Sequence, residues 1–144
     1  MGNVWDIKGR HKVKMAGERG QRAICMGGMT PTKLATADFI QISTTGDAVD
    51  FGDLFAATNL TGGCANHLRT FYGGGYAPSV TNNIGSFLAS SKGNAVNFGD
   101  LTVARAYFGS GVASNVRGLW AGGWISPAPT NVMDYITFAS IGNA

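Results

Sequence analysis

The sequence repeats itself with a period close to 48 residues, and such a period constrains the fold more than any local propensity. Three similar stretches, RAICMGG, RTFYGGG and RGLWAGG, begin at Arg22, Arg69 and Arg117. A second motif, GDAVDFGDL from residue 46, returns as GNAVNFGDL from residue 93. Because one spacing relates several motifs, we predict three packed copies of one structural unit in a single repeat domain. The domain spans residues 1–144, and its units cover about residues 1–45, 46–92 and 93–144.

Each unit has the patterning of short β-strands. RGLWAGG alternates with the two-residue period of a strand and ends in glycines that suit a sharp turn. DYITFAS, from Asp134, is rich in β-branched and aromatic residues, and TVARAYFG, from Thr102, predicts a further strand. NFGDL, from Asn97, places an aromatic residue before a Gly-Asp turn. Four short strands in about 48 residues match one β-propeller blade, so we predict an all-β fold of three four-stranded units with very little helix.

Positive charge is concentrated near the start of the chain. Residues 1–22 hold six basic and two acidic side chains, whereas the remainder holds five basic and six acidic ones. In an extended strand, Lys8, Arg10, Lys12 and Lys14 would point to one face, which suits an acidic partner such as capsid protein, DNA or an anionic glycan. The same pattern suits a solvated edge strand whose lysines discourage aggregation. Nucleic acid is the weaker candidate because no aromatic residues interleave for base stacking.

The repeated arginines predict a structural role. A guanidinium offers five donors in a fixed fork, so each of these arginines should bond backbone carbonyls or an aspartate of the neighbouring unit. Asp53 and Asp100 are the candidate aspartates. The double glycines close strands and lack a following helix and a Walker lysine, so they do not form a phosphate loop. The repeated residues are Arg22, Arg69, Arg117, Gly27, Gly28, Gly74, Gly75, Gly122 and Gly123.

The residues after each double glycine differ between units, and Met29, Tyr76 and Trp124 open these stretches. Variable loops on a constant scaffold are where binding residues are usually found. Tyr76 and Trp124 are therefore candidate loop contacts, because an aromatic ring stacks on sugars or anchors a protein contact. The alternative is that each residue covers the end of its own unit.

We expect no catalytic residues, metal site or cofactor. His11 and His67 lie in different units, without neighbours at zinc-binding spacing and without a paired nucleophile. Cys25 and Cys64 are predicted to be buried thiols. No apolar run approaches the roughly 20 residues needed to cross a bilayer, and the N-terminus lacks the apolar core of a signal peptide. The expected protein is not an enzyme and makes no membrane contact.

The order of an arginine, an apolar strand ending in two glycines and a tyrosine-bearing strand resembles the kelch repeat. The stretch SKGNAVNFGDLTVAR, residues 91–105, more closely resembles tandem repeats in virion structural and tail or fibre proteins of tailed bacteriophages, notably marine and cyanobacterial ones. The resemblance covers about residues 20–144 and implies a β-propeller on a virus particle. The tryptophan that usually follows the tyrosine strand of a kelch repeat is absent, and Phe51, Phe98 or Trp5 would take its place.

Three blades are too few to close a propeller ring, which typically needs four or more. An open array exposes sheet edges that pair with other chains. The chain is also cut within its repeat, so we expect the end of one copy to continue into the start of another. The predicted assembly is a homodimer with six blades.

The expected function is that of a non-enzymatic structural protein of the phage virion, either a capsid decoration protein or a tail or fibre component. It would be assembled in the host cytoplasm, with itself and other virion proteins as partners. The alternative is a receptor- or glycan-binding adhesion module on the virion surface, which uses the loops after the double glycines to contact host-surface glycan.

Overall fold

The computed structural model describes residues 22–108 and 111–144, and all the regular secondary structure in them is β-strand. The predicted all-β fold is therefore confirmed. The described residues contain no helix that could cross a membrane. Sheet 1 consists of β1 (Arg22–Thr30), β2 (Thr32–Gln41) and β3 (Val49–Asp53). Sheet 2 consists of β4 (Gly62–Ala65), β5 (Arg69–Gly73), β6 (Asn83–Leu88) and β7 (Val96–Asp100). Sheet 3 consists of β8 (Gly111–Ala113), β9 (Arg117–Ala121) and β12 (Met133–Thr137), beside a small ribbon of β10 (Trp124–Ile125) and β11 (Ala128–Pro129).

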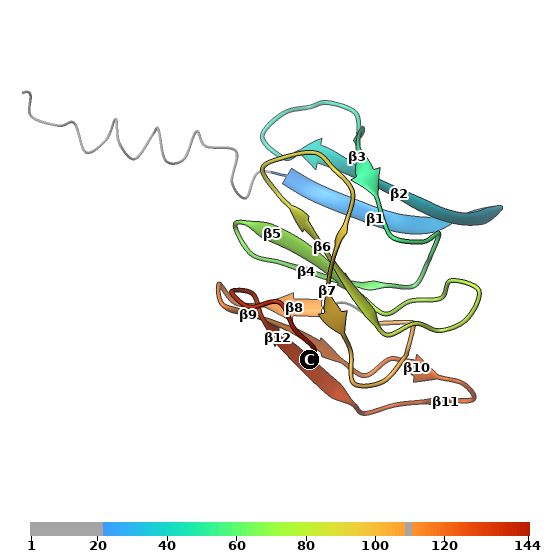
Figure 1. Ribbon diagram of the computed structural model, residues 1–144. Helices are drawn as coiled ribbons and strands as arrows, with labels where there is room; N and C mark the ends of the chain where they lie inside the picture. Colours follow the sequence, from blue (N-terminus) through green and yellow to red (C-terminus); the bar gives the residue numbers. More distant parts are fainter. Residues whose placement is uncertain (1–21, 109–110) are drawn as a thin grey trace, which may run out of the picture.

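The three sheets are antiparallel and lie one above another, with sheet 2 in the middle (Figure 1). They use the same register. Ala37 of β2 lies opposite Gly52 of β3, and Ile84 of β6 lies opposite Gly99 of β7, each next to a register shift. The strands β3 and β7 are therefore equivalent, and we call them outer strands. In sheet 3, β12 takes the place that β2 and β6 take in the other sheets.

Only the middle sheet has the four strands predicted for each unit. Among the described residues, sheet 1 has no strand beside β1 at the place of β4, and sheet 3 has no outer strand beside β12. Within residues 22–108 and 111–144, both end sheets therefore have an edge without a paired strand. Edge strands carry unpaired backbone N–H and C=O groups, which makes them sites for pairing with another chain.

Two local predictions were wrong. The predicted Gly-Asp turn of NFGDL lies inside β7, where Gly99 has a φ of +156°. The predicted strand TVARAYFG is an irregular link through residues 102–108, whose one backbone bridge joins Ala106 to Trp124. Gly-Asp is a typical turn signal, but here a neighbouring segment passes close to the strand and glycine makes room for it.

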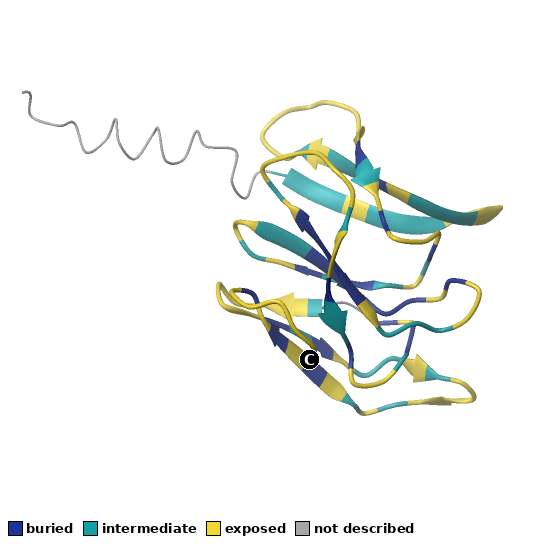
Figure 2. Ribbon diagram, viewed as in Figure 1, coloured by how far each residue is buried: buried dark blue, intermediate teal, exposed yellow. Residues whose placement is uncertain are grey.

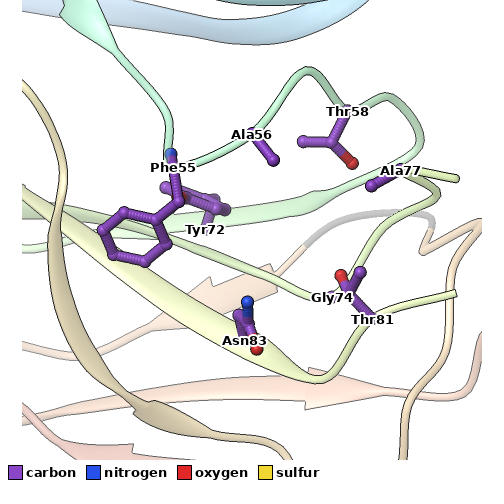
Figure 3. Close-up of a pocket in the computed structure, with 8 residues that line it drawn as sticks. All are labelled: Phe55, Ala56, Thr58, Tyr72, Gly74, Ala77, Thr81 and Asn83. Atoms are coloured by element: carbon purple, nitrogen blue, oxygen red, sulfur yellow. The ribbon is translucent and has the colours of Figure 1, made fainter. Parts of the chain in front are cut away.

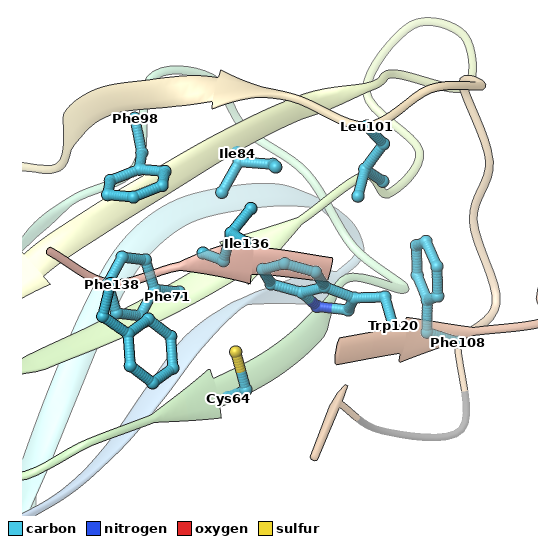
Figure 4. Close-up of a cluster of buried hydrophobic side chains, with 9 residues drawn as sticks. All are labelled: Cys64, Phe71, Ile84, Phe98, Leu101, Phe108, Trp120, Ile136 and Phe138. Carbon is cyan, nitrogen blue, oxygen red and sulfur yellow. The ribbon is translucent and has the colours of Figure 1, made fainter. Parts of the chain in front are cut away.

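Hydrophobic clusters fill the two spaces between the sheets. The cluster between sheets 2 and 3, drawn in Figure 4, is the larger. It contains Cys64, Phe71, Ile84, Phe98, Leu101, Phe108, Trp120, Ile136 and Phe138. The cluster between sheets 1 and 2 contains Ala37, Phe51, Leu54, Tyr72 and Phe87. Burial of a large apolar side chain contributes about 1.5–3 kcal/mol, so these clusters hold the stack together.

The middle sheet is covered on both faces and the third sheet on one. Four successive residues of β6, Ile84–Phe87, are buried, whereas burial alternates along β12, where Asp134 and Ile136 are buried and Met133 and Tyr135 are exposed. Figure 2 shows this contrast along the two strands. Continuous burial is typical of a strand between two layers, and alternation is typical of a sheet with one free face.

Trp120 explains several glycines of the second and third units. Its indole is fully buried, and its Nε1–H donates a hydrogen bond to the Gly62 carbonyl over 2.9 Å. A Cβ on Gly62 would lie 2.8 Å from the indole, and one on Gly73 would lie 3.1 Å from it. Glycine at these positions lets the largest side chain of the core pack directly on strand backbone.

Candidate functional site

Successive sheets are joined by backbone hydrogen bonds along a seam. Between sheets 1 and 2, the Gly93 N–H donates to the Phe51 carbonyl over 2.9 Å, and the Ala95 N–H donates to the Asp53 carbonyl over 2.8 Å. The Oδ1 of Asn94 accepts the Asp53 N–H over 3.1 Å. The Gly-Asn-Ala segment that follows β6 of sheet 2 is thus paired with the outer strand β3 of sheet 1.

The seam between sheets 2 and 3 repeats these bonds one period later. Gly142 and Ala144 donate to the carbonyls of Phe98 and Asp100, both over 2.9 Å, and Asn143 Oδ1 accepts the Asp100 N–H over 3.0 Å. A Cβ on Gly99 would overlap the Gly142 carbonyl. Because the two seams have the same bonds, the repeat motif GNA and the glycine of FGD together determine how one sheet joins the next.

The first two double glycines form backbone hydrogen bonds with the segments that link the outer strands β3 and β7 to the next sheet. Gly28 and Gly75 donate to the carbonyls of Thr58 and Arg105 over 3.0 and 2.9 Å. Gly74 has a φ of +59°, and a Cβ there would overlap the Arg105 carbonyl. The double glycine therefore supplies both a left-handed conformation and an open space for a crossing chain.

The third double glycine has the same left-handed backbone conformation, but no linking segment crosses it among the described residues. Gly122 has a φ of +68°, but the nearest atom to a Cβ there is the Thr130 carbonyl oxygen at 3.5 Å. Gly123 has a φ of +106°. Within the described part of the chain, no link lies across Gly122 as links lie across Gly27 and Gly74.

Both ends of the stack expose apolar side chains at positions that are buried inside it. On sheet 3, Met133 is 63% and Tyr135 is 55% exposed, and Met133 is equivalent to the fully buried Ile84 of sheet 2. On sheet 1, Ile42 is 62% exposed, although its equivalent in sheet 3, Phe138, is buried. We call these surfaces the sheet 3 face and the sheet 1 face.

A buried ion pair lies beside the edge strand β12. Arg105 Nη1 and Asp134 Oδ2 are 2.6 Å apart, and both side chains are almost fully buried. Arg105 also donates to the Trp120 carbonyl over 3.3 Å, and Thr102 donates to Asp134 Oδ1 over 2.6 Å. The guanidinium lies 5.2 Å from the centre of the Phe108 ring. The pair joins the link after β7 to the third sheet. Its hydrogen bonds offset part of the cost of burying two charges, while the Nε of Arg105 is buried without a partner among the described residues.

Sequence reasoning missed this pair because it is not repeated. Thr58 stands at the position of Arg105 in the previous unit, and Gly85 stands at the position of Asp134. Only the lone aspartate in the apolar strand DYITFAS hinted that a buried charge needs a partner. Among the described residues, the two predicted partners Asp53 and Asp100 form no ion pair with an arginine, and their backbone N–H groups bond at the seams.

The three repeated arginines lie in different surroundings. Arg22 Nη1 donates to the Ala89 carbonyl of the next sheet over 3.0 Å, as expected for a bond to the neighbouring unit. Arg69 is partly buried in sheet 2. Arg117 is exposed on the sheet 3 face, with its guanidinium 5.1 Å from the centre of the Tyr135 ring.

The two candidate loop residues bond through their backbones to the link that leads into their own sheet. Tyr76 pairs with Asn59, and Trp124 pairs with Ala106, in both cases through reciprocal N–H to carbonyl bonds. Their side chains are 40% and 38% exposed. Lys33 Nζ lies 3.8 Å from the centre of the Tyr76 ring. Met29, the third of these residues, lies within the β1–β2 hairpin and not in a loop.

Several predicted features have other outcomes. The basic residues Lys8, Arg10, Lys12 and Lys14 lie outside the described residues. Cys25 is exposed, which contradicts the prediction of a buried thiol, whereas Cys64 is buried as predicted. Burial raises the pKa of the Cys64 thiol to about 12. Burial also raises the pKa of Tyr72, whose hydroxyl oxygen accepts the Phe55 N–H over 3.2 Å.

The cavity drawn in Figure 3 is small. It lies beside Phe55, Thr58, Tyr72 and Asn83 and has a volume of about 30 Å³. That volume holds one or two water molecules. An open depression of about 380 Å³ lies beside Tyr135, Thr137 and Asn143, at the end of β12, and its volume lies within the usual range of small-molecule sites. Residues 22–108 and 111–144 contain no cluster of three or more metal-binding side chains. We take the seams and the two end sheets, where this depression also lies, as the candidate functional surfaces.

Comparison with known proteins adds no relative. The sequence matches no protein family model, and no curated protein matches it.

Proposed function

We propose that this protein is a non-enzymatic structural protein of a bacteriophage virion, serving as a capsid decoration protein or as a tail or fibre component. The observation that carries the proposal is the seam, in which the Asn94 and Asn143 segments bond to outer strands in the same way, while among the described residues both end sheets have an edge without a paired strand. A stack of sheets that meet through a repeated set of backbone bonds suits assembly.

The kelch-like interpretation rests on the middle unit. Sheet 2 has four antiparallel strands, with an arginine at the start of β5 and a double glycine just after it ends. Six such units from two chains would form one propeller ring. Light scattering after size exclusion tests this homodimer, and a stable monomer at micromolar concentration would contradict it.

An adhesion function is the second candidate, and one observation favours it. The β1–β2 hairpin and the β10–β11 ribbon extend to the same side of the stack (Figure 1). Lys33 lies near the start of β2, with its Nζ over the Tyr76 ring, and Trp124 lies in β10. A cation beside an exposed aromatic ring suits an anionic sugar. The contact would be with host-surface glycan.

Purified phage particles test the proposed location. Quantitative mass spectrometry should detect the chain among the virion proteins, and its copy number should be in the hundreds for decoration or a handful for a tail or fibre. Absence from washed, infectious particles would contradict the proposal. A glycan array separates the candidates, because a Trp124→Ala variant should lose signal only if the protein is an adhesion module.

A further inference from the structure

The two internal seams show which residues a further seam would need. At the inner seam, the Phe71 ring of sheet 2 stacks on the Phe138 ring of sheet 3, with 4.6 Å between centroids. One unit further on, Leu119 stands at the place of Phe71. Two units back from Phe138, with Ala89 of sheet 2 between them, stands Ile42, the residue that follows β2. Leu119 therefore lies on the sheet 3 face and Ile42 on the sheet 1 face.

We propose that the sheet 3 face of one copy packs against the sheet 1 face of a second copy, and so forms a third seam of the same kind. This inference rests on the proposed assembly function and names the surfaces it uses. Leu119, Met133 and Tyr135 of one copy contact Ile40 and Ile42 of the other. Ile40 is 40% exposed here, and its equivalents Phe87 and Ile136 are buried at the internal seams.

The polar groups on the two faces fit this arrangement. Arg22 bonds the Ala89 carbonyl across the first seam, and Arg117 and Ile42 are the equivalents of that donor and acceptor on the free faces. The Arg117 guanidinium of one copy therefore donates to the Ile42 carbonyl of the other. Asp47 stands where Asn94 and Asn143 accept a backbone N–H, and it is exposed.

Cysteine crosslinking between two separately prepared proteins tests the contact. One protein carries Ile42→Cys and the other Leu119→Cys, both with Cys25→Ser to remove the exposed natural thiol. After mixing and mild oxidation, intact mass should show a disulfide-linked heterodimer as the main product. The matched control replaces Leu119→Cys with Ala128→Cys, which lies on the exposed β10–β11 ribbon. Its yield should be at least tenfold lower.

Two results would overturn the inference. The first is no heterodimer with Leu119→Cys, and the second is equal yield with Ala128→Cys. A protein that carries Ile42→Cys and Leu119→Cys together should likewise link between chains, and a purely intrachain disulfide would also overturn it. A positive crosslink with no trace of the chain in virions would instead reject the proposed location and leave the third seam standing.

Discussion

The two seams of the stack have the same backbone bonds and different packing. In both, a Gly-Asn-Ala segment bonds to the outer strand before it, through Asn94 in one and Asn143 in the other. The seam between sheets 2 and 3 adds Trp120 and the Arg105–Asp134 ion pair. The seam between sheets 1 and 2 has Tyr72 at the tryptophan position and no such ion pair among its described residues.

This comparison separates what defines the seam from what strengthens it. The repeated bonds and glycines set how one sheet meets the next, because backbone geometry tolerates changes of side chain. The side chains that fill the space vary in size and polarity from one seam to the other. We therefore expect substitutions of the shared bonds to affect both seams equally, and substitutions of the packing residues to affect them unequally.

The largest difference should come from the ion pair. Asp134→Ala leaves the Arg105 charge buried without its partner, so unfolding free energy should fall by about 3–5 kcal/mol in urea titrations. Thr58→Ala, at the equivalent of Arg105, should cost about 1 kcal/mol. The double variant Arg105→Met with Asp134→Leu should recover most of the loss, since it removes both charges. A double variant as unstable as Asp134→Ala would show that charge burial is not the cause.

The aromatic residue at the centre of each seam should give the next largest difference. Trp120→Phe leaves the Gly62 carbonyl without its donor and should lower stability by about 1–3 kcal/mol. Tyr72→Phe removes one hydrogen bond, to the Phe55 N–H, and should cost about 0.5–1.5 kcal/mol. Thermal unfolding of both variants measures the difference. A larger loss for Tyr72→Phe would contradict the ranking of the seams.

The shared asparagines should give small and equal effects. Asn94→Ala and Asn143→Ala each remove one side-chain acceptor from an outer-strand N–H, which should cost about 0.5–1.5 kcal/mol. Ser114→Ala, which removes the local turn bonds from the Val116 and Arg117 N–H groups, serves as a control outside the seams. Unequal losses at Asn94 and Asn143, beyond about 0.5 kcal/mol, would mean that the two seams do not share one bonding scheme.

The reactivity of the two cysteine thiols should distinguish the larger seam from the exposed strand β1, with almost no effect on stability at neutral pH. Cys64, at the larger seam, should resist alkylation at pH 8 because burial raises its pKa to about 12, while the exposed Cys25 should react within minutes. The folded pKa lies above the ordinary value of 9.0, so this thiol's contribution to stability is complete below pH 9 and is lost as the pH rises toward 12. Mass spectrometry of the alkylated peptides checks the reactivity. Rapid labelling of Cys64 in the folded protein would contradict the burial.

The all-β fold and the repeat could be predicted because the same signals occur three times. Strands beginning at Arg22, Arg69 and Arg117 lie where alternation and the double glycines place them. The interior of the repeat was harder to predict, since Gly99 looks like a turn residue and serves a strand that another segment crosses. That requirement comes from a contact 43 positions away along the chain, which local patterning does not contain.

The candidate site was predictable only in its repeated parts. The bond from Arg22 to the next sheet follows from the chemistry of a repeated guanidinium. The Arg105–Asp134 pair does not follow, because its two members lie 29 positions apart and occur in one unit alone. The prediction of a buried Cys25 rests only on the general tendency of cysteine to be buried. Its equivalents Tyr72 and Trp120 are each covered by the preceding sheet, and the described residues contain no sheet that precedes sheet 1 and could cover Cys25.

The seam formed by Asn94, and repeated by Asn143, has a consequence for how such a gene could change in length. Every donor at a junction lies one period from its counterpart, so the duplication of a whole period would extend the stack with each donor still opposite an acceptor. An insertion of a few codons within the period would shift the asparagine away from its outer strand. Growth by complete units is therefore the tolerated form of variation, and the number of stacked sheets can change without a new junction having to evolve.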